Sequence, residues 1–231
     1  MKIRVKFEKQ GNLRFIGHLD VMRYFQKMNR RAGLDVKYSM GFSPHQEMSF
    51  GSPLGLGLLS KAEYVDIEFN TVPPMEELID RMNAVSVPEL RILSAALLPD
   101  KAKNAMSLLA AADYELSFRA EKTKEEYDAF FERLFGFLEK EEIIVLRETK
   151  KHTENADIKP MIKKAERRGN MLFLQVDAGS KSNLRPELLL KAFYEDRGEV
   201  FDPFAFNIER TELYGEEEGE LKDFLSYGEK W

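Results

Sequence analysis

Apolar and polar residues alternate at the start of the chain, and this alternation then gives way to a helical period. Ile3, Val5 and Phe7 are separated by basic residues, which predicts a strand with one buried face. From about residue 19 to 32, apolar residues recur every three or four positions and basic residues fall on the opposite side, as in an amphipathic helix. Gly33 predicts the end of that helix.

The same reasoning divides the rest of the first half into strands and a helix. In chain order, the predictions are strands over 35–40, 47–50 and 63–69, a helix from 73 or 74 to 82, and a strand over 90–98. The order strand, helix, strand, strand, helix, strand is that of a ferredoxin-like unit. Residues 99–112 are expected to connect this unit to a second domain.

The second half has a similar order of elements. The predictions are strands over 114–119, 143–147, 171–176 and 206–213, a hairpin turn at 168–170, and helices over 124–140 and 186–196, the first begun by Thr123. We therefore expect an α+β fold with two tandem ferredoxin-like (βαββαβ) domains, residues 1–100 and 112–214, and an acidic tail, 215–231. One split α+β domain is the alternative, because periodicity does not show whether the two sheets join.

Composition narrows the class of protein. The 231 residues are 43% hydrophobic and 32% charged, as in a soluble globular protein. No apolar run reaches the roughly 18 residues of a membrane span, so we expect a cytoplasmic protein without membrane contact. The absence of cysteine excludes disulfides, thiol catalysis and thiolate-bound metal centres. An all-histidine metal site would need His18, His45 and His152 together, and we expect neither metal nor cofactor.

The net charge of −5 is the sum of a basic N-terminal segment, an acidic C-terminal segment and the residues between them. Residues 1–50 hold ten Lys or Arg against four acids, and residues 195–231 hold twelve acids against four bases. Such ends indicate a nucleic-acid surface with an acidic flank, or two surfaces that attract each other within one chain or in a homodimer. Solvated faces without specific meaning are the other interpretation.

Two histidine cassettes lie on either side of the basic helix. The first is Gly17-His18-Leu19-Asp20. A neutral imidazole at a helix N-terminus could orient a phosphate or act as a base. The alternative is that His18 only hydrogen-bonds the backbone of its own turn.

The second cassette is the run 41–50, GFSPHQEMSF, which contains Ser43, His45 and Ser49. Glycine and serine in this run could let a backbone approach a phosphate or nucleotide. A tight loop without a ligand is equally compatible, since the run matches neither a P-loop nor GxGxxG.

A ladder of cations can follow a nucleic-acid backbone, and nearby aromatic rings can stack on bases. Phe15, Tyr24, Tyr38, Phe42 and Phe50 are the candidate rings, although aromatic residues in strands are usually buried. The candidate RNA- or anion-binding residues are Arg14, His18, Arg23, Lys27, Arg30, Arg31, Ser43, His45 and Ser49.

Longer strings of the sequence resemble a known family. The first half contains KIRVKFEKQGNLRFIGHLD, RRAGL, YSMGFSPHQEMSF and PLGLGLLSKAEYVDIEF, and the C-terminal part contains SNLRPELLLKAF and ERTELY. These strings span nearly the whole chain and resemble the radical SAM-linked protein family, a bacterial domain family of unknown function. The resemblance carries over no catalytic or binding residue.

The resemblance implies an association. Such domains are fused to a radical SAM enzyme or encoded beside one, often near ribosome and RNA-processing genes. This chain has no CxxxCxxC motif, so it is similar to the separate accessory form, and iron–sulfur and SAM chemistry would belong to a partner. A weaker similarity, in architecture and an early histidine, is to the tandem ferredoxin-like RNA-binding and RNA-cleaving proteins of CRISPR systems, which is a poor guide to function.

Three hypotheses follow. The leading one is a non-catalytic adaptor that binds RNA through its basic N-terminal surface and presents it to a radical SAM partner. The second is a protein-interaction module without RNA, in which the basic half docks an acidic partner or the acidic tail of a second copy. The third is a metal-independent ribonuclease in which His18 or His45 acts as acid and base.

Overall fold

Two compact units make up the chain. The computed structural model describes residues 1–148 and 153–231, so His152 lies outside the described residues. Unit 1 comprises Met1–Ala110 and Arg210–Trp231, and unit 2 comprises Ala111–Glu209. The predicted α+β class is confirmed, because both units combine helices with antiparallel strands.

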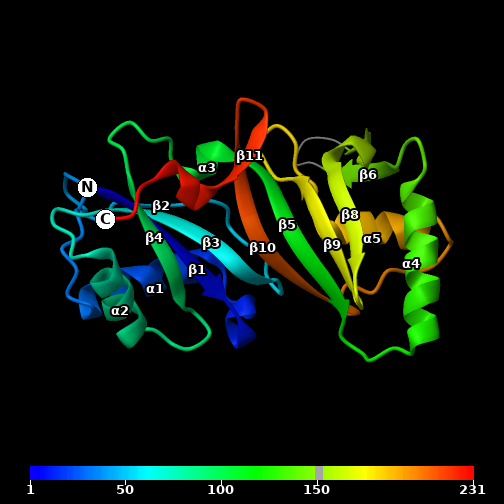
Figure 1. The fold of residues 1–231 in the computed structure, drawn as a ribbon, viewed down its shortest axis with the longest axis horizontal. Helices are drawn as coiled ribbons and strands as arrows, with labels where there is room; N and C mark the ends of the chain where they lie inside the picture. The colour runs from blue at the N-terminus through cyan, green and yellow to red at the C-terminus, as the bar shows by residue number, and fades with distance from the viewer. Residues whose placement is uncertain (149–152) are drawn as a thin grey trace. The chain divides into compact units, whose positions relative to one another are not determined.

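Unit 1 has the predicted succession of strand, helix, two strands, helix and strand (Figure 1). Its elements are β1 (Lys2–Lys9), η1 (Gly11–Phe15), α1 (His18–Arg31), β2 (Met48–Phe50), β3 (Leu59–Glu68), α2 (Met75–Ala84), β4 (Ile92–Leu98), α3 (Ala105–Leu108), β11 (Glu220–Asp223) and η3 (Phe224–Tyr227). Strand β1 lies between β3 and β4, antiparallel to both. Strand β2 pairs antiparallel with β3.

One face of the unit 1 sheet carries the hydrophobic core. Because side chains alternate along a strand, Ile3, Val5 and Phe7 of β1 point to the same face, and each is at most 1% exposed. They pack with Phe25 of α1 and Leu78 of α2. Both helices therefore cover this face, and the charged residues between the apolar positions of β1 point to the other.

Unit 2 contains the elements α4 (Lys124–Leu138), β6 (Ile144–Glu148), β7 (Thr153–Asp157), η2 (Lys159–Met161), β8 (Ile162–Arg168), β9 (Met171–Asp177) and α5 (Pro186–Glu195). Strand β9 pairs antiparallel with β5 (Leu109–Phe118) and β8, and β6 forms a separate hairpin with β7. The last long strand, β10 (Phe206–Glu217), begins in unit 2 and continues in unit 1.

The start of α4 agrees with the sequence. Thr123 accepts a hydrogen bond from the Glu126 amide at 3.2 Å, and the Glu126 carboxylate accepts one from the Thr123 amide at 2.7 Å. This capping box satisfies two amides that a helix end leaves without partners. Phe130 of the same helix packs against Phe193 of α5 at a ring-centroid distance of 5.7 Å, so both helices contribute to the core of unit 2.

Two local expectations differ from the structure. Residues 35–40 are not a strand and form only single bridges, Val36 with Phe69 and Tyr38 with Gln46. The prediction was wrong because a short apolar and polar alternation does not ensure a neighbouring strand for continuous pairing.

Residues 215–231, expected as an acidic tail, belong to unit 1. Strand β11 pairs with β10, Glu229 bridges Leu97, and the Trp231 indole donates to the Pro73 carbonyl at 3.1 Å. The acidic residues are interspersed with apolar ones, such as the fully buried Phe224, and these hold the segment in place. The observed units therefore differ from the predicted boundaries 1–100, 112–214 and 215–231.

Among residues 1–148 and 153–231, every helix is too short or too polar to span a bilayer. Within the same residues, His, Asp and Glu side chains do not gather in groups of three that could hold a metal ion.

Candidate functional site

The outer side of α1 is a cationic face, defined by Arg23, Lys27, Arg30 and Arg31, all of which are exposed. The helix is amphipathic, so burial of its apolar side leaves these bases in solvent. Arg23 lies 3.4 Å from the Asp20 carboxylate. Lys27, Arg30 and Arg31 make no ion pair with any residue that the structure describes, so three positive charges are available to a partner.

An exposed loop, residues 38–45, begins and ends beside α1. Gln46 holds it there, because its side chain donates to the Gln26 carbonyl of α1 at 3.2 Å and accepts from Asn29 at 2.9 Å. The Gln46 amide also donates to the Tyr38 hydroxyl at 3.2 Å. Phe42, in the middle of the loop, is fully exposed. The loop is therefore attached to the helix that carries the cationic face, and it presents an exposed aromatic ring.

His45 is held by its own loop. Its Nδ1 lies 2.9 Å from the Ser39 hydroxyl and 3.3 Å from the Ser43 carbonyl, and its backbone amide donates to Ser39 Oγ at 3.1 Å. Ser43 is exposed. All of these contacts lie within the loop itself. They agree with the interpretation of residues 41–50 as a tight loop without a ligand.

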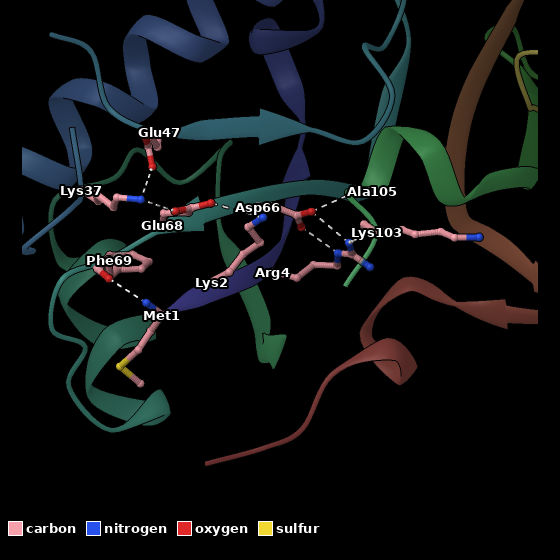
Figure 2. Close-up of polar contacts among 10 residues, drawn as sticks. All are labelled: Met1, Lys2, Arg4, Lys37, Glu47, Asp66, Glu68, Phe69, Lys103 and Ala105. Atoms are coloured by element: carbon pink, nitrogen blue, oxygen red, sulfur yellow. Dashed lines mark hydrogen bonds and ion pairs between the residues drawn. The ribbon is translucent and has the colours of Figure 1, made fainter. Parts of the chain in front are cut away.

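His45 and Ser49 line a cavity that is rich in carboxylates. Its wall also contains Lys37, Glu47 and Glu68. Figure 2 shows Lys37 between the two glutamates, at 2.9 Å from Glu47 and 3.0 Å from Glu68. The hydrogen bond from Lys37 lowers the pKa of Glu68 to about 2. Because the lysine is already paired with acids, this cavity is a poor place for an anion.

Arg4, on the same face of the sheet, is buried rather than exposed. Its guanidinium donates to both carboxylate oxygens of Asp66, at 2.7 and 2.9 Å, and to the carbonyls of Phe224 and Lys103, both at 3.1 Å. The Asp66 carboxylate also accepts from the Ala105 amide at 3.0 Å (Figure 2). The strand pattern had placed Arg4 on the polar side of β1, and this polar side is covered here.

His18 lies on the other face of the sheet, at the first position of α1. Its ring meets Phe50 edge to face at 5.1 Å. Phe50 and Ser49 are consecutive residues of β2, so their side chains point to opposite faces. His18 and His45 therefore line different cavities, and the two histidines are not placed to act as acid and base on one bond.

The cavity beside His18 contains a group that the sequence reasoning missed. Lys9, only 2% exposed, lines it together with Ser52 and Glu63. The Lys9 ammonium donates to the Ile16 carbonyl at 3.1 Å. Burial lowers the pKa of Lys9 below its ordinary value, and the negative charge of Glu63 opposes this effect. A sequence signal existed, because Lys9 follows the core residue Phe7 at the spacing of a strand.

Arg210 engages the carboxylate of Glu63 in the same region. Its Nε donates to Glu63 Oε1 at 3.1 Å, and its Nη2 donates to the same carboxylate oxygen. Arg210 also donates to the Ser52 carbonyl at 2.8 Å and to the Ser52 hydroxyl at 3.2 Å. The charge of Glu63 is therefore balanced by an arginine that lies 147 positions away in the sequence, which local patterns do not indicate.

The last predicted binding residue, Arg14, lies at the end of η1 and is half-buried. Its guanidinium lies over the Phe15 ring at 5.1 Å, and Phe15 itself is exposed. The structure thus attaches the 38–45 loop to the helix that carries the bases, through Gln46. His18 and Ser49 line two different cavities.

Sequence comparison assigns the family. A family model described as an uncharacterized protein conserved in bacteria (DUF2344) matches residues 2–186. The chain belongs to this family. Like the family that the sequence resembles, DUF2344 is a bacterial family of uncharacterized proteins. The association with radical SAM enzymes stays a prediction. A search among curated proteins found no match.

Two solved structures are similar to this DUF2344 chain in part of their length. A chain from the crystal structure of a Cbf5-Nop10-Gar1 complex is 12% identical, with a TM-score of 0.45. The match covers 94% of the present chain and 50% of the chain from the complex. A chain from the archaeal box H/ACA sRNP Nop10-Cbf5 complex has 10% identity and a TM-score of 0.40, covering 90% and 46%. The DUF2344 chain spans half or less of these chains, and similarities this weak do not indicate what it binds.

Proposed function

We propose that this protein binds single-stranded RNA through the cationic face of α1 and the exposed loop 38–45, without itself being catalytic. The observation that carries the proposal is the presence on α1 of Lys27, Arg30 and Arg31, three exposed cations without ion pairs among the described residues. The loop that carries the exposed ring of Phe42 is attached to the same helix through Gln46. Proteins that bind single strands combine a positive surface for the phosphates with aromatic rings for the bases.

Neutralising the cationic face tests this proposal. In a Lys27→Gln, Arg30→Gln, Arg31→Gln variant, we expect affinity for a fluorescent single-stranded RNA to fall about tenfold or more. The log–log salt slope should be reduced by roughly 2, about 0.7 for each lost contact with a phosphate of a single strand. Fluorescence anisotropy over a salt series measures both quantities. Glutamine has a helix propensity similar to those of lysine and arginine, so the fold should remain.

The matched control removes the same charge elsewhere, through Lys101→Gln, Lys124→Gln and Lys181→Gln, all at exposed positions. It should bind RNA nearly as the wild type does. Equal losses in both variants would mean that only net charge matters, and unchanged binding by the folded α1 variant would rule out the proposed surface. Binding by that surface of an acidic protein instead of RNA would make the chain a protein-interaction module.

We further propose that the protein serves as an accessory to a radical SAM enzyme, to which it presents the RNA. This part rests on the family resemblance and on the lack of cysteine, which leaves the iron–sulfur chemistry to a partner. Affinity purification of the tagged protein at about 100 mM salt, where exposed charges act over roughly 10 Å, should recover a radical SAM enzyme together with a defined RNA. Recovery of RNA without such an enzyme would contradict the accessory role and leave the RNA surface standing.

A further inference from the structure

A buried ammonium without a carboxylate partner lies beneath His18. No carboxylate of the described residues comes within ion-pair distance of Lys9, although its side chain is almost fully buried. Its one hydrogen bond is to the Ile16 carbonyl, and an ammonium has three donors. The negative charge of Glu63 acts on Lys9 only from beyond ion-pair distance. Burying a charge without a close partner is costly, so this position favours the arrival of an anion.

The surroundings of Lys9 suit an anionic oxygen. The cavity that it lines measures about 10 Å³, room for about one water-sized atom. Half-buried His18 and exposed Pro53 also line it, so it lies just beneath the surface. Glu63 is the acid in its wall, and its carboxylate is engaged by Arg210, which reduces its repulsion of an anion.

The N-terminus of α1 adds to this attraction. His18 is the first residue of the fourteen-residue helix, and the residue before it, Gly17, provides no side-chain cap. The first amides of such a helix and its dipole favour a negative group. The helix end reaches the cavity through His18 and Val21, which line it together with Lys9, and Asp20 is the acid of the first helical turn.

We propose that the cavity beneath His18 accepts one oxygen of a phosphate group, beside the Lys9 ammonium, while the other phosphate oxygens lie outside the cavity, next to His18 at its rim. The site is separate from the cationic face of α1, and its occupant is either free phosphate or the terminal phosphate of a nucleotide. Lys9 supplies the charge, and His18 supplies a ring nitrogen that can donate to a second oxygen.

Thermal unfolding of the full chain with inorganic phosphate tests the site, with chloride of equal ionic strength as the reference. We expect phosphate to raise the Tm of the wild type by about 5 °C at 100 times its Kd. The rise should vanish in Lys9→Met, because methionine keeps most of the apolar part of the side chain and removes the charge. It should persist in the Lys27→Gln, Arg30→Gln, Arg31→Gln variant, so this test and that of RNA binding fail independently.

A second measurement uses the unmodified protein, in case Lys9→Met does not fold. In ¹⁵N-detected imidazole spectra, phosphate should shift the His18 resonances and leave those of His45, which lines the other cavity, unchanged. A stronger effect of uridine 5′-monophosphate than of inorganic phosphate would assign the site to a nucleotide, and equal effects would assign it to free phosphate. Absence of a phosphate-specific Tm rise, or an equal rise in folded Lys9→Met, would overturn the proposal.

Discussion

Replacing Asp66 by alanine is expected to lower the free energy of unfolding by about 3–5 kcal/mol, the usual cost of removing one partner of a buried ion pair. Arg4 is 0% exposed and Asp66 is 2% exposed, so water cannot take the place of the lost carboxylate. The carbonyls of Phe224 and Lys103 would remain as acceptors, but neither carries a charge. The midpoint of urea-induced unfolding, at an unchanged slope, measures the effect.

The control is the paired replacement Arg4→Met, Asp66→Leu. Because it removes both charges, the variant should be much closer to the wild type than Asp66→Ala is. If the single and paired replacements were equally unstable, the loss would come from packing around the site and the interpretation of an uncompensated arginine would be wrong.

Glu63→Ala is expected to have an effect of similar size, about 3–5 kcal/mol, for a related reason. The carboxylate is an acceptor for Arg210 and also counters the charge of nearby Lys9. Its removal leaves positive charge in a place with little solvent. Adding Lys9→Met to Glu63→Ala should therefore restore part of the stability.

A double-mutant cycle measures this coupling. Urea unfolding of the wild type, Lys9→Met, Glu63→Ala and the double variant gives the interaction free energy directly. We expect the double variant to be more stable than the sum of the single effects indicates. Strict additivity would show that Lys9 does not sense the charge of Glu63.

The hydrophobic pattern was sufficient to predict the helix that carries the candidate surface. The spacing of Val21, Phe25 and Met28 predicted a helix over about 19–32, and the structure has α1 over His18–Arg31 with these side chains buried. The exposure of Lys27 and Arg30 follows from the same period. That they bind RNA stays a prediction, since exposure alone does not identify a ligand.

Other parts of the candidate site depend on contacts that local patterns do not contain. Arg4 looked like an outward-pointing base, and its burial depends on the carbonyl of Phe224, 220 positions away. Likewise, the attachment of the 38–45 loop to α1 depends on Gln46, whose sequence neighbours do not indicate its partner Asn29. Periodicity shows which side of an element is apolar, and it does not show what covers the polar side.

The division of unit 1 into two chain segments has a consequence for protein synthesis. Asp66 and Lys103, two partners of Arg4, leave the ribosome early, whereas Phe224 follows only after all of unit 2 has been made. At about 5–20 residues per second, this interval lasts on the order of ten seconds. During that time the nascent chain carries an N-terminal sheet whose charged face is still open, so unit 2 can finish folding before unit 1 does.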